Sequence, residues 1–593
     1  MSIDADALEA IATRYGARGG QPGLAYGVIA NGELVHSGGR GERWLGGPPP
    51  DAGTVFRIAS MTKSFTATLV LMLRDRGALR LDDHAAGYVP VLGGVEMPSA
   101  DSPPITIRHL LTMTAGFPTD DPWGDRQQGL DPMAFAQLLA DGVVRCAWAP
   151  GTRFEYSNLG YAVLGKVIES VTGLEYAHAI RTEVLGPLML TQTGYEASNF
   201  DPAHLARGYH RDGADWRELT PDPHGAFAPM GGIFSCVADL AGWVAGFAGA
   251  WPPRSRPAAD ADHPLSRATR REMQLGQVAI TDPGAGPLAQ FSGPASISYG
   301  FGLFAEDDPA FGTIVQHSGG YPGYGSQMRW HPATGLGTVV LANGTYAHAG
   351  ALAAELLSAL LTAEDQQDRE RGRAPIRGPL PGGQPWPETL AARDTVDNLL
   401  LDWSDDVAVR IFTPNVELDR PIAQRQADVA MLRERIGAFA ADPGRPAEYD
   451  SPAHCRWWLT GPGGTVTVQI KVPPLRHLLV QQLAIAVPPA SGSALHAALD
   501  QLVAAVNAAE VNTGAPAWPA SLTSADGFDA SRAERQLRIA AAWAGQCALD
   551  CYLAGNGSTS ATVRLAGPTG KVVLAVEISE SGQLQRAEVT LAG

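Results

Sequence analysis

The feature that most constrains how this chain can fold is a polar segment, Glu364–Glu388, between two long regions that are rich in apolar residues. Its first eight residues, Glu364–Arg371, include no apolar side chain, and its end, Pro379–Pro385, is made largely of Pro and Gly. A helix cannot continue through closely spaced prolines. With 593 residues the chain is also too long for a single core. We therefore predict a linker at residues 366–388, with separate domains on either side.

The region before the linker, residues 1–365, predicts an antiparallel sheet flanked by helices. Residues 4–17 have the spacing of an amphipathic helix, and residues 24–37 alternate around Asn31-Gly32, a strong hairpin signal. Helical patterns, which predict a helical subdomain, fill the middle of this region. Further strands are expected at Tyr299–Phe304, Thr313–His317, Ser326–His331 and Thr338–Asn343. The predicted class is mixed α/β, of the α+β kind.

The region after the linker contains an internal repeat with a constant offset of 106 residues. Leu459, Gly461, Pro462, Gly464, Val466, Val468, Ile470 and Val472 match Leu565, Gly567, Pro568, Gly570, Val572, Leu574, Val576 and Ile578. Each copy has a helical pattern and then two alternating stretches joined by a Gly-Pro turn. We predict two small α+β modules, residues 389–488 and 489–593. Chance similarity between two hairpins is the alternative.

Ser60 and Lys63 form a Ser-x-x-Lys motif at the start of a helical pattern. Positions i and i+3 share a helix face, so the lysine amine can lie beside the serine hydroxyl and take its proton. Only four of the 44 basic residues are Lys, and the other 40 are Arg, which does not give up its proton in proteins. A lysine at this place therefore suggests a catalytic role. The alternative is a surface lysine without a catalytic role, near a helix cap.

Two further motifs follow at long separations. Tyr156-Ser157-Asn158 lies between a Pro-Gly turn and a helix, and a tyrosine beside Ser60 can pass a proton to a leaving group. His317-Ser318-Gly319-Gly320 ends a predicted strand, where glycine lets a substrate lie against the strand edge. Each motif alone also fits an ordinary loop or turn.

As a set, Ser-x-x-Lys, Tyr-x-Asn and His-x-Gly resemble the penicillin-recognising serine hydrolases: class C β-lactamases, D,D-carboxypeptidases, D-aminopeptidases and esterases. The resemblance spans residues 5 to 362. It implies the β-lactamase-like fold, catalytic roles for Ser60 (nucleophile), Lys63 (base) and Tyr156 (proton shuttle), and no cofactor. It also implies substrate-binding roles for Asn158, His317, Gly319 and Gly320, with the backbone amides of Ser60 and Gly320 forming the oxyanion hole.

The expected function is hydrolysis of esters or amides, including D-amino-acid peptides, through a covalent acyl-enzyme. Many relatives that act on β-lactams have a lysine where this chain has His317, which is mostly neutral near pH 7 at its ordinary pKa. A true β-lactamase or D,D-peptidase is the first alternative. An inactive binding or scaffold protein that acts through its C-terminal repeats is the second.

Composition excludes other classes of function. A net charge of −17 disfavours nucleic acids and anionic membranes as partners. Neither His-Glu-x-x-His nor Cys-x-x-Cys occurs, so no metal is predicted. Five scattered cysteines and an N-terminus without signal-peptide features predict a cytoplasmic protein. The expected partners are a small-molecule or peptide substrate and, through the C-terminal modules, a protein partner or a second copy of the chain.

Overall fold

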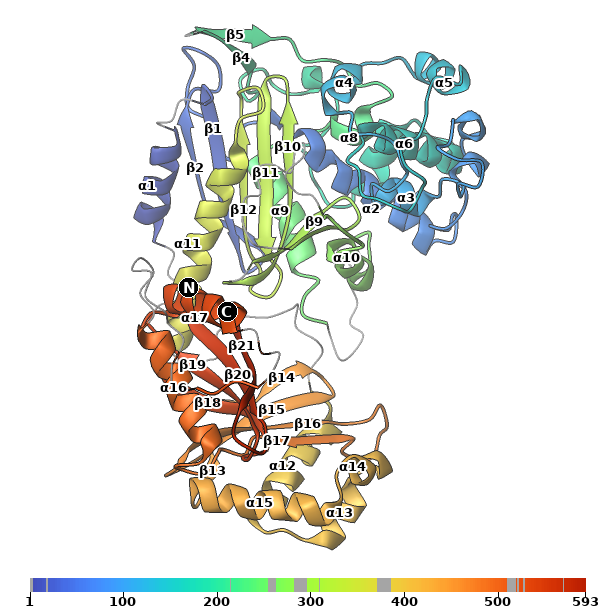
Figure 1. Cartoon of the computed structure of the whole chain (residues 1–593). Helices are drawn as coiled ribbons and strands as arrows, with labels where there is room; N and C mark the ends of the chain where they lie inside the picture. Colours follow the sequence, from blue (N-terminus) through green and yellow to red (C-terminus); the bar gives the residue numbers. More distant parts are fainter. Residues whose placement is uncertain are drawn as a thin grey trace. The chain divides into compact units, whose positions relative to one another are not determined.

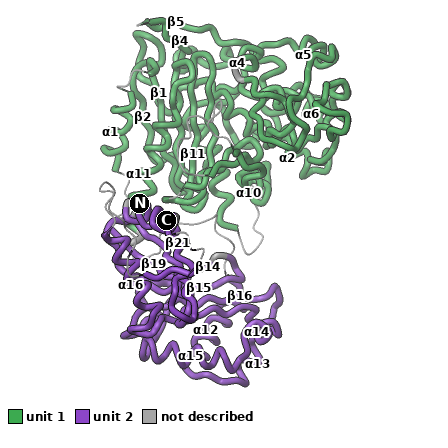
Figure 2. Tube along the Cα trace, viewed as in Figure 1, with its two compact units in different colours: residues 1–381 green, residues 382–593 purple. Residues whose placement is uncertain are grey.

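The computed structural model describes residues 4–592 apart from 17–19, 214, 254–262, 282–295, 309, 371–384, 509–518, 520–521, 526–527, 529 and 569. The chain divides into two compact units, residues 1–381 and 382–593 (Figure 2). The helix that closes the first unit continues to Glu370, a few residues into the predicted linker. Most of that linker lies outside the described residues.

An eight-stranded antiparallel sheet forms the centre of the first unit (Figure 1). Its strands, in spatial order, are β2 (Glu33–Gly41), β1 (Gly23–Ala30), β12 (Leu336–Ala342), β11 (Tyr324–His331), β10 (Gly312–Tyr321), β9 (Phe304–Asp308), β8 (Ile297–Tyr299) and β7 (Val278–Ala279). The first two strands thus lie at one edge of the sheet. The other six follow in the sequence after the long, mostly helical region between β2 and β7.

The first hairpin forms as its sequence predicts. Ala30 pairs with Glu33, so Asn31 and Gly32 are the two turn residues. Their φ angles are +54° and +80°, the left-handed conformation that Asn and Gly adopt most readily and that a tight hairpin needs. Every residue of β1 is buried, because helices cover both faces of the sheet.

Two helical layers cover the sheet. On one face, α1 (Ala5–Gly16) and α11 (Ala349–Glu370) pack against alternate residues of β1, such as Leu24 and Tyr26. On the other face, α9 (Val237–Ala248) packs against the residues between them, such as Ala25. The period of two along the strand therefore divides its side chains between two cores.

The helical subdomain comprises most of the residues between β2 and β7. Its helices are α2 (Thr62–Asp75), α3 (Ile107–Leu111), α4 (Asp121–Gly124), α5 (Pro132–Ala140), α6 (Asn158–Thr172), α7 (Tyr176–Ile180), α8 (Ala228–Gly231) and α10 (Arg267–Gln274). Two small ribbons accompany them: β3 (Phe56–Arg57) with β6 (Phe234–Ser235), and β4 (Gly208–Asp212) with β5 (Asp215–Leu219).

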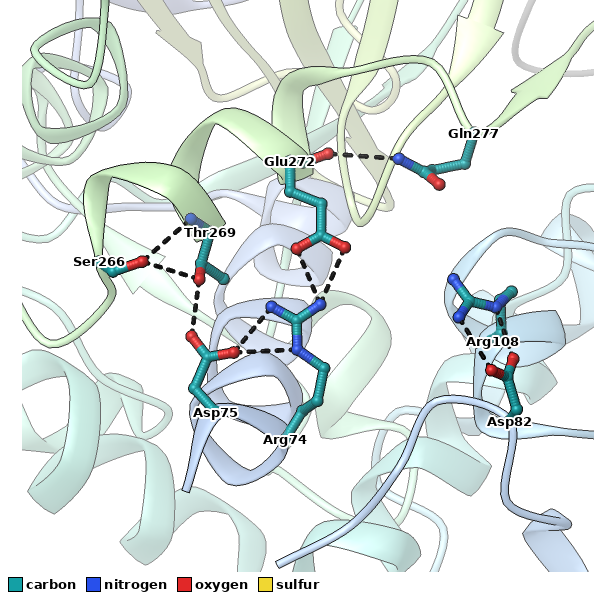
Figure 3. Close-up of polar contacts among 8 residues, drawn as sticks. All are labelled: Arg74, Asp75, Asp82, Arg108, Ser266, Thr269, Glu272 and Gln277. Carbon is teal, nitrogen blue, oxygen red and sulfur yellow. Dashed lines mark hydrogen bonds and ion pairs between the residues drawn. The ribbon is translucent and has the colours of Figure 1, made fainter. Parts of the chain in front are cut away.

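Helix α2 is enclosed on all sides, with every residue from Thr62 to Leu73 buried. The Phe65 ring stacks on Trp243 of α9, with centroids 3.8 Å apart. At its far end the Arg74 guanidinium donates to both carboxylate oxygens of Glu272 on α10, at 2.9 and 2.8 Å (Figure 3). Thr269 of α10 donates to the Asp75 carboxylate at 2.6 Å (Figure 3). These contacts fix the helix that carries Lys63.

One predicted strand, Tyr299–Phe304, is wrong. Tyr299 ends β8 and Phe304 begins β9, and the two residues face each other across a turn. Gly302 has a φ of +71°, and a Cβ at this position would lie 2.6 Å from the Lys63 carbonyl oxygen. The segment turns because glycine permits the left-handed conformation and a close approach to α2.

The second unit follows the predicted repeat. Its elements are α12 (Pro387–Leu401), α13 (Asp405–Ile411), α14 (Pro414–Asp419), α15 (Ile422–Ile436), β13 (Ala440–Ala441), β14 (Glu448–Ser451), β15 (His454–Gly461), β16 (Gly464–Lys471), β17 (Gln482–Ile485), α16 (Ala494–Ala508), α17 (Ala530–Ala544), β18 (Ala548–Gly555), β19 (Ser560–Ala566), β20 (Lys571–Ile578) and β21 (Leu584–Ala592). Leu459 pairs with Val466 in one hairpin, and Leu565 pairs with Val572 in the other. The 106-residue offset thus relates strands in the same register.

The nine strands that the structure describes in the second unit join one sheet, through a parallel contact between β16 and β18 at Val466 and Tyr552. The Asp550 carboxylate connects the two repeats by accepting from Arg445 at 2.5 Å and from Arg564 at 2.6 Å. The predicted fold class, a helix-flanked antiparallel sheet with α+β repeats after it, is confirmed. The boundary at residues 488 and 489 stays a prediction.

Within the described ranges, no helix combines the length and the apolar character that crossing a membrane requires. The cytoplasmic location stays a prediction.

Candidate active site

Ser60 and Lys63 lie side by side at the start of α2. Ser60 belongs to a short 3₁₀ helix, Ala59–Met61, that runs directly into α2, and the Lys63 Nζ atom lies 3.0 Å from the Ser60 Oγ atom. The Lys63 side chain is fully buried. The spacing of the motif therefore produces the contact that the sequence predicts, inside the protein and not at its surface.

The backbone before the nucleophile is tightly packed. Ala59 has a φ of +47°, which is uncommon for a residue with a Cβ atom. Gly319 on β10 lies so close that a Cβ there would be 2.2 Å from the Ile58 carbonyl oxygen. The Ser326 hydroxyl on β11 donates to the same oxygen at 2.7 Å. Gly319 thus allows the sheet to lie directly against the segment that presents Ser60.

Asn158 completes the surroundings of the lysine amine. Its Oδ1 atom accepts a hydrogen bond from Lys63 Nζ at 2.7 Å, and the Met230 carbonyl oxygen of α8 accepts another at 2.9 Å. Asn158 is the first residue of α6 and is itself fully buried. Two of the three sequence motifs therefore meet at one amine.

The Asp120 carboxylate fixes the start of α6. It accepts from the backbone N–H groups of Asn158, at 2.7 Å, and Leu159, at 2.9 Å, and from the Ser157 hydroxyl at 3.1 Å. A negative charge at this end also complements the helix dipole. Burial raises the pKa of Asp120, an effect that these hydrogen bonds oppose.

A cavity of about 160 Å³ opens beside Ser60. Its lining residues come from the helical subdomain and from the sheet: Ser60, Asp125, Tyr156, Phe304, His317, Ser318, Gly320 and Tyr346. The Tyr156 ring centroid lies 4.9 Å from Lys63 Nζ, and the ring stacks on Phe304. Tyr156 therefore borders both the lysine and the space in which a substrate would lie.

His317 is completely buried on β10, among the aromatic rings of Phe304, Tyr299 and Tyr156. Its Nδ1 atom lies 2.6 Å from the Ser318 carbonyl oxygen and so carries the proton, whereas Nε2 is buried without a hydrogen-bond partner in the described residues. Burial, followed by the charge of Lys63, lowers the pKa of His317 to about 3. The expectation of an ordinary histidine pKa is wrong, because the ring is enclosed.

The site brings all of the predicted residues together and adds others that the motifs do not reveal. Gly320 lines the cavity, and Gly319 lies beneath it, against the nucleophile segment. The additional residues are Asp120, Asp125, Met230, Phe304 and Tyr346. Met230 contributes only a backbone oxygen, which no side-chain pattern can predict.

Over the part of the chain that the structure describes, no three His, Cys, Asp or Glu side chains gather in a way that could hold a metal ion. The candidate site is built from hydroxyl, amine, amide, imidazole and carboxylate groups.

The family model described as Beta-lactamase matches residues 8–362 of this chain, which includes every residue of the candidate site. The chain belongs to the beta-lactamase family. This match covers most of the first unit and ends before the linker.

Curated relatives in the same region include Protein flp of Staphylococcus aureus, which is 27% identical over 331 residues. That alignment covers 55% of this chain and 60% of the relative. A penicillin-binding protein of Bacillus subtilis (strain 168) is 27% identical over 296 residues, or 47% of this chain and 58% of that protein. The similarity thus spans about three fifths of the curated relatives' length.

Among solved structures, this chain is similar to the octameric penicillin-binding protein homologue from Pyrococcus abyssi. The superposition has a TM-score of 0.50 and 19% identity, and it covers 99% of this chain and 100% of the other. At this identity the similarity concerns the fold alone.

Proposed function

We propose that this member of the beta-lactamase family is a serine hydrolase that cleaves esters or amides through an acyl-enzyme on Ser60. The observation that carries the proposal is the arrangement around Lys63 Nζ, which lies within 3.0 Å of Ser60 Oγ, Asn158 Oδ1 and the Met230 carbonyl oxygen. A neutral amine has two N–H donors and one lone pair. To act as a base Lys63 must first lose a proton, and Asn158 Oδ1 and the Met230 carbonyl oxygen can then accept from its two remaining N–H groups while its lone pair serves the Ser60 hydroxyl.

In the proposed reaction, Lys63 takes the proton as Ser60 Oγ bonds to the substrate carbonyl carbon. The backbone N–H groups of Ser60 and Gly320 stabilise the oxyanion. Tyr156 then delivers a proton to the leaving group, the carbonyl–leaving-group bond breaks, and an alcohol or amine departs. Water then attacks the ester on Ser60 and gives a proton to Tyr156, while Lys63 returns its proton to Ser60 Oγ. These transfers release the acid and restore the serine hydroxyl.

The buried state of His317 supports simple esters and amides over β-lactams. A substrate carboxylate is attracted by a fixed positive charge, and a histidine with a pKa of about 3 has none at neutral pH. Hydrolysis of β-lactams or D,D-peptides stays the first alternative, and it fits the name of the Bacillus subtilis relative. A scaffold without activity is disfavoured by the intact set of polar contacts around Lys63.

The experiment that tests the proposal is labelling of the full chain with a fluorophosphonate, followed by mapping of the adduct. We expect the adduct on Ser60, and we expect Ser60→Ala to lower kcat/KM for a neutral ester by a factor on the order of 10⁴ to 10⁶. An adduct on another residue, or undiminished turnover by Ser60→Ala, would contradict the proposal.

Lys63→Arg separates the base role from a purely electrostatic one. Arginine keeps the positive charge and cannot act as a base near neutral pH. We expect Lys63→Arg to lose as much kcat/KM as Lys63→Ala. Near-normal turnover by Lys63→Arg would mean that the amine supplies only charge. Lys166→Arg is the matched control, because Lys166 lies on α6 and pairs with Glu169 outside the cavity lining.

A further inference from the structure

Arg57 is a buried arginine in β3, three residues before Ser60 in the sequence. It is only 1% exposed, and its Nη2 atom donates to the Asp222 carbonyl oxygen at 2.7 Å. Its Nε and Nη1 atoms are buried with no hydrogen-bond partner within the described part of the chain. Burying a charge and leaving two donors unpaired costs stability. Stability alone therefore does not explain an arginine at this position.

Two aromatic rings enclose the Arg57 guanidinium group. Its Cζ atom lies 4.6 Å from the Phe234 ring centroid and 4.5 Å from the Tyr321 ring centroid. Both rings are buried, and cation–π contacts are strongest where water is excluded. Phe234 belongs to β6, which pairs with β3, whereas Tyr321 is the last residue of β10. Arg57 thus joins the segment that presents the nucleophile to the end of the strand that carries the third motif.

Asp222 makes a second connection between the same two segments. It lies in the loop between β5 and α8. Its backbone carbonyl oxygen accepts from Arg57, and its Oδ2 atom accepts from the Tyr321 hydroxyl at 2.5 Å. Burial raises the pKa of Tyr321, so its hydroxyl stays protonated and continues to donate. The guanidinium group and the phenol are therefore held by one loop residue as well as by their direct contact.

The two segments that Arg57 connects are those that supply the proposed oxyanion hole. One donor is the backbone N–H of Ser60, and the other is the backbone N–H of Gly320, the residue directly before Tyr321. Ser60 and Gly320 both line the cavity. Stabilisation of an oxyanion requires both donors to lie about 2.7–3.1 Å from the position that the charged oxygen will occupy. A contact that fixes the spacing of the two segments therefore fixes the spacing of the two donors.

From these contacts we propose that Arg57 is a positioning residue, which sets the distance between the Ser60 and Gly320 N–H groups and so shapes the oxyanion hole. The proposal rests on the proposed function, because the hole acts only in acyl transfer to Ser60. Arg57 lies outside the cavity lining and acts through Tyr321 and Asp222. A planar guanidinium can stack on rings and donate to an oxygen at its edge at the same time. This role accounts for a buried charge with unpaired donors, since departures from good packing rules are expected at functional sites.

The test replaces Arg57 with methionine, which keeps much of the side-chain length and removes the charge and the unpaired donors. Arg57→Met should be at least as stable as the wild type in thermal unfolding, because it buries no unpaired donor. For a neutral ester we expect kcat to fall by about 10- to 100-fold with little change in KM, since the oxyanion donors remain but are misplaced. The inhibition constant of phenylboronic acid, whose tetrahedral adduct on Ser60 occupies the hole, should rise by a similar factor.

Arg425→Met is the matched control. Arg425 is also a buried arginine, with its Cζ atom 5.9 Å from the Phe412 ring centroid, but it lies in the second unit. Its replacement should leave kcat and the affinity for phenylboronic acid at their wild-type values.

The affinity for phenylboronic acid decides the outcome. If Arg57→Met binds the boronic acid as tightly as the wild type, the proposal is overturned, whatever happens to its stability, because Arg57 is then only structural. If Arg57→Met does not fold, Tyr321→Phe takes its place, since it keeps the ring and loses the bond to Asp222. We expect that variant to bind the boronic acid about threefold more weakly or worse, and unchanged binding would overturn the proposal. No ester turnover by the wild type, together with no fluorophosphonate adduct on Ser60, would instead refute the proposed function.

Discussion

At the scale of single residues, burial keeps the His317 side chain uncharged. The ring lies among aromatic side chains, where burial disfavours the charged form, and the Lys63 charge opposes protonation further. The histidine therefore remains a neutral hydrogen-bond acceptor at Nε2 over the physiological range. A substrate N–H or O–H suits such an atom better than a carboxylate does.

This state predicts a pH dependence of stability. The unfolded chain protonates His317 below about pH 6.5, whereas the folded chain resists protonation until about pH 3. The unfolded state thus binds more protons between these values, and the free energy of unfolding falls as the pH falls, by up to about 1.4 kcal/mol per pH unit. His317→Asn should lose less stability between pH 7 and pH 5 than the wild type, as urea unfolding would measure. Equal losses would mean that His317 is protonated in the folded state.

The site residues that could be predicted from sequence are those that belong to a short motif. Ser60 and Lys63 lie one helical turn apart, so their contact follows from the helix itself. Asp125 and Tyr346 are separated by 221 residues, and neither belongs to a motif. Only the tertiary structure brings them together.

At the scale of elements, α6 depends on a capping group distant in sequence. The usual N-cap is the residue just before the helix, and Ser157 does accept from Gly160, at a long 3.4 Å. Asp120, however, receives three shorter hydrogen bonds at the same end, from residues 37 to 39 positions later. It thereby positions the segment that carries both Tyr156 and Asn158.

Removing this cap should affect stability and catalysis together. We expect Asp120→Ala to lower the free energy of unfolding by roughly 1–3 kcal/mol, because three donors lose a buried acceptor. Asn158 should then shift, and kcat for a neutral ester should fall. Asp120→Asn retains an acceptor oxygen and should lose less of both. Thermal unfolding and kcat measurements on the two variants check this, and a fully active Asp120→Ala would show that Asn158 is held by other contacts.

Elements with a clear hydrophobic period could be predicted, whereas glycine-dependent turns could not. Helix α6 has the spacing of apolar residues expected of a helix, and the first hairpin has the Asn31-Gly32 turn signal. The segment between Tyr299 and Phe304 is apolar enough for a strand. Its Gly302, however, packs closely against the carbonyl group of Lys63, a residue distant in the sequence. No local pattern contains that constraint.

At the scale of the whole molecule, the sequence repeat predicts two similar modules but not how their edges meet. The hairpins of each module follow from alternation and turn residues. The parallel contact between β16 and β18 joins the two modules in one sheet. These two strands are separated in the sequence by the helices α16 and α17, so no local pattern predicts that they pair. Binding of a protein partner or of a second copy of the chain through these repeats stays a prediction. Light scattering of the full chain would measure its mass in solution and so test self-association.

The division into units predicts that catalysis belongs to the first unit alone. Every residue of the candidate site lies before residue 347, and the apolar residues of α11 that pack on the sheet end at Leu361. A protein that ends at Glu370 keeps this helix whole. It should be soluble, unfold cooperatively and hydrolyse a neutral ester with the kcat/KM of the full chain. Its Ser60→Ala variant is the control. Aggregation or loss of turnover would mean that the second unit completes the core or the site, since no other part of the chain is removed.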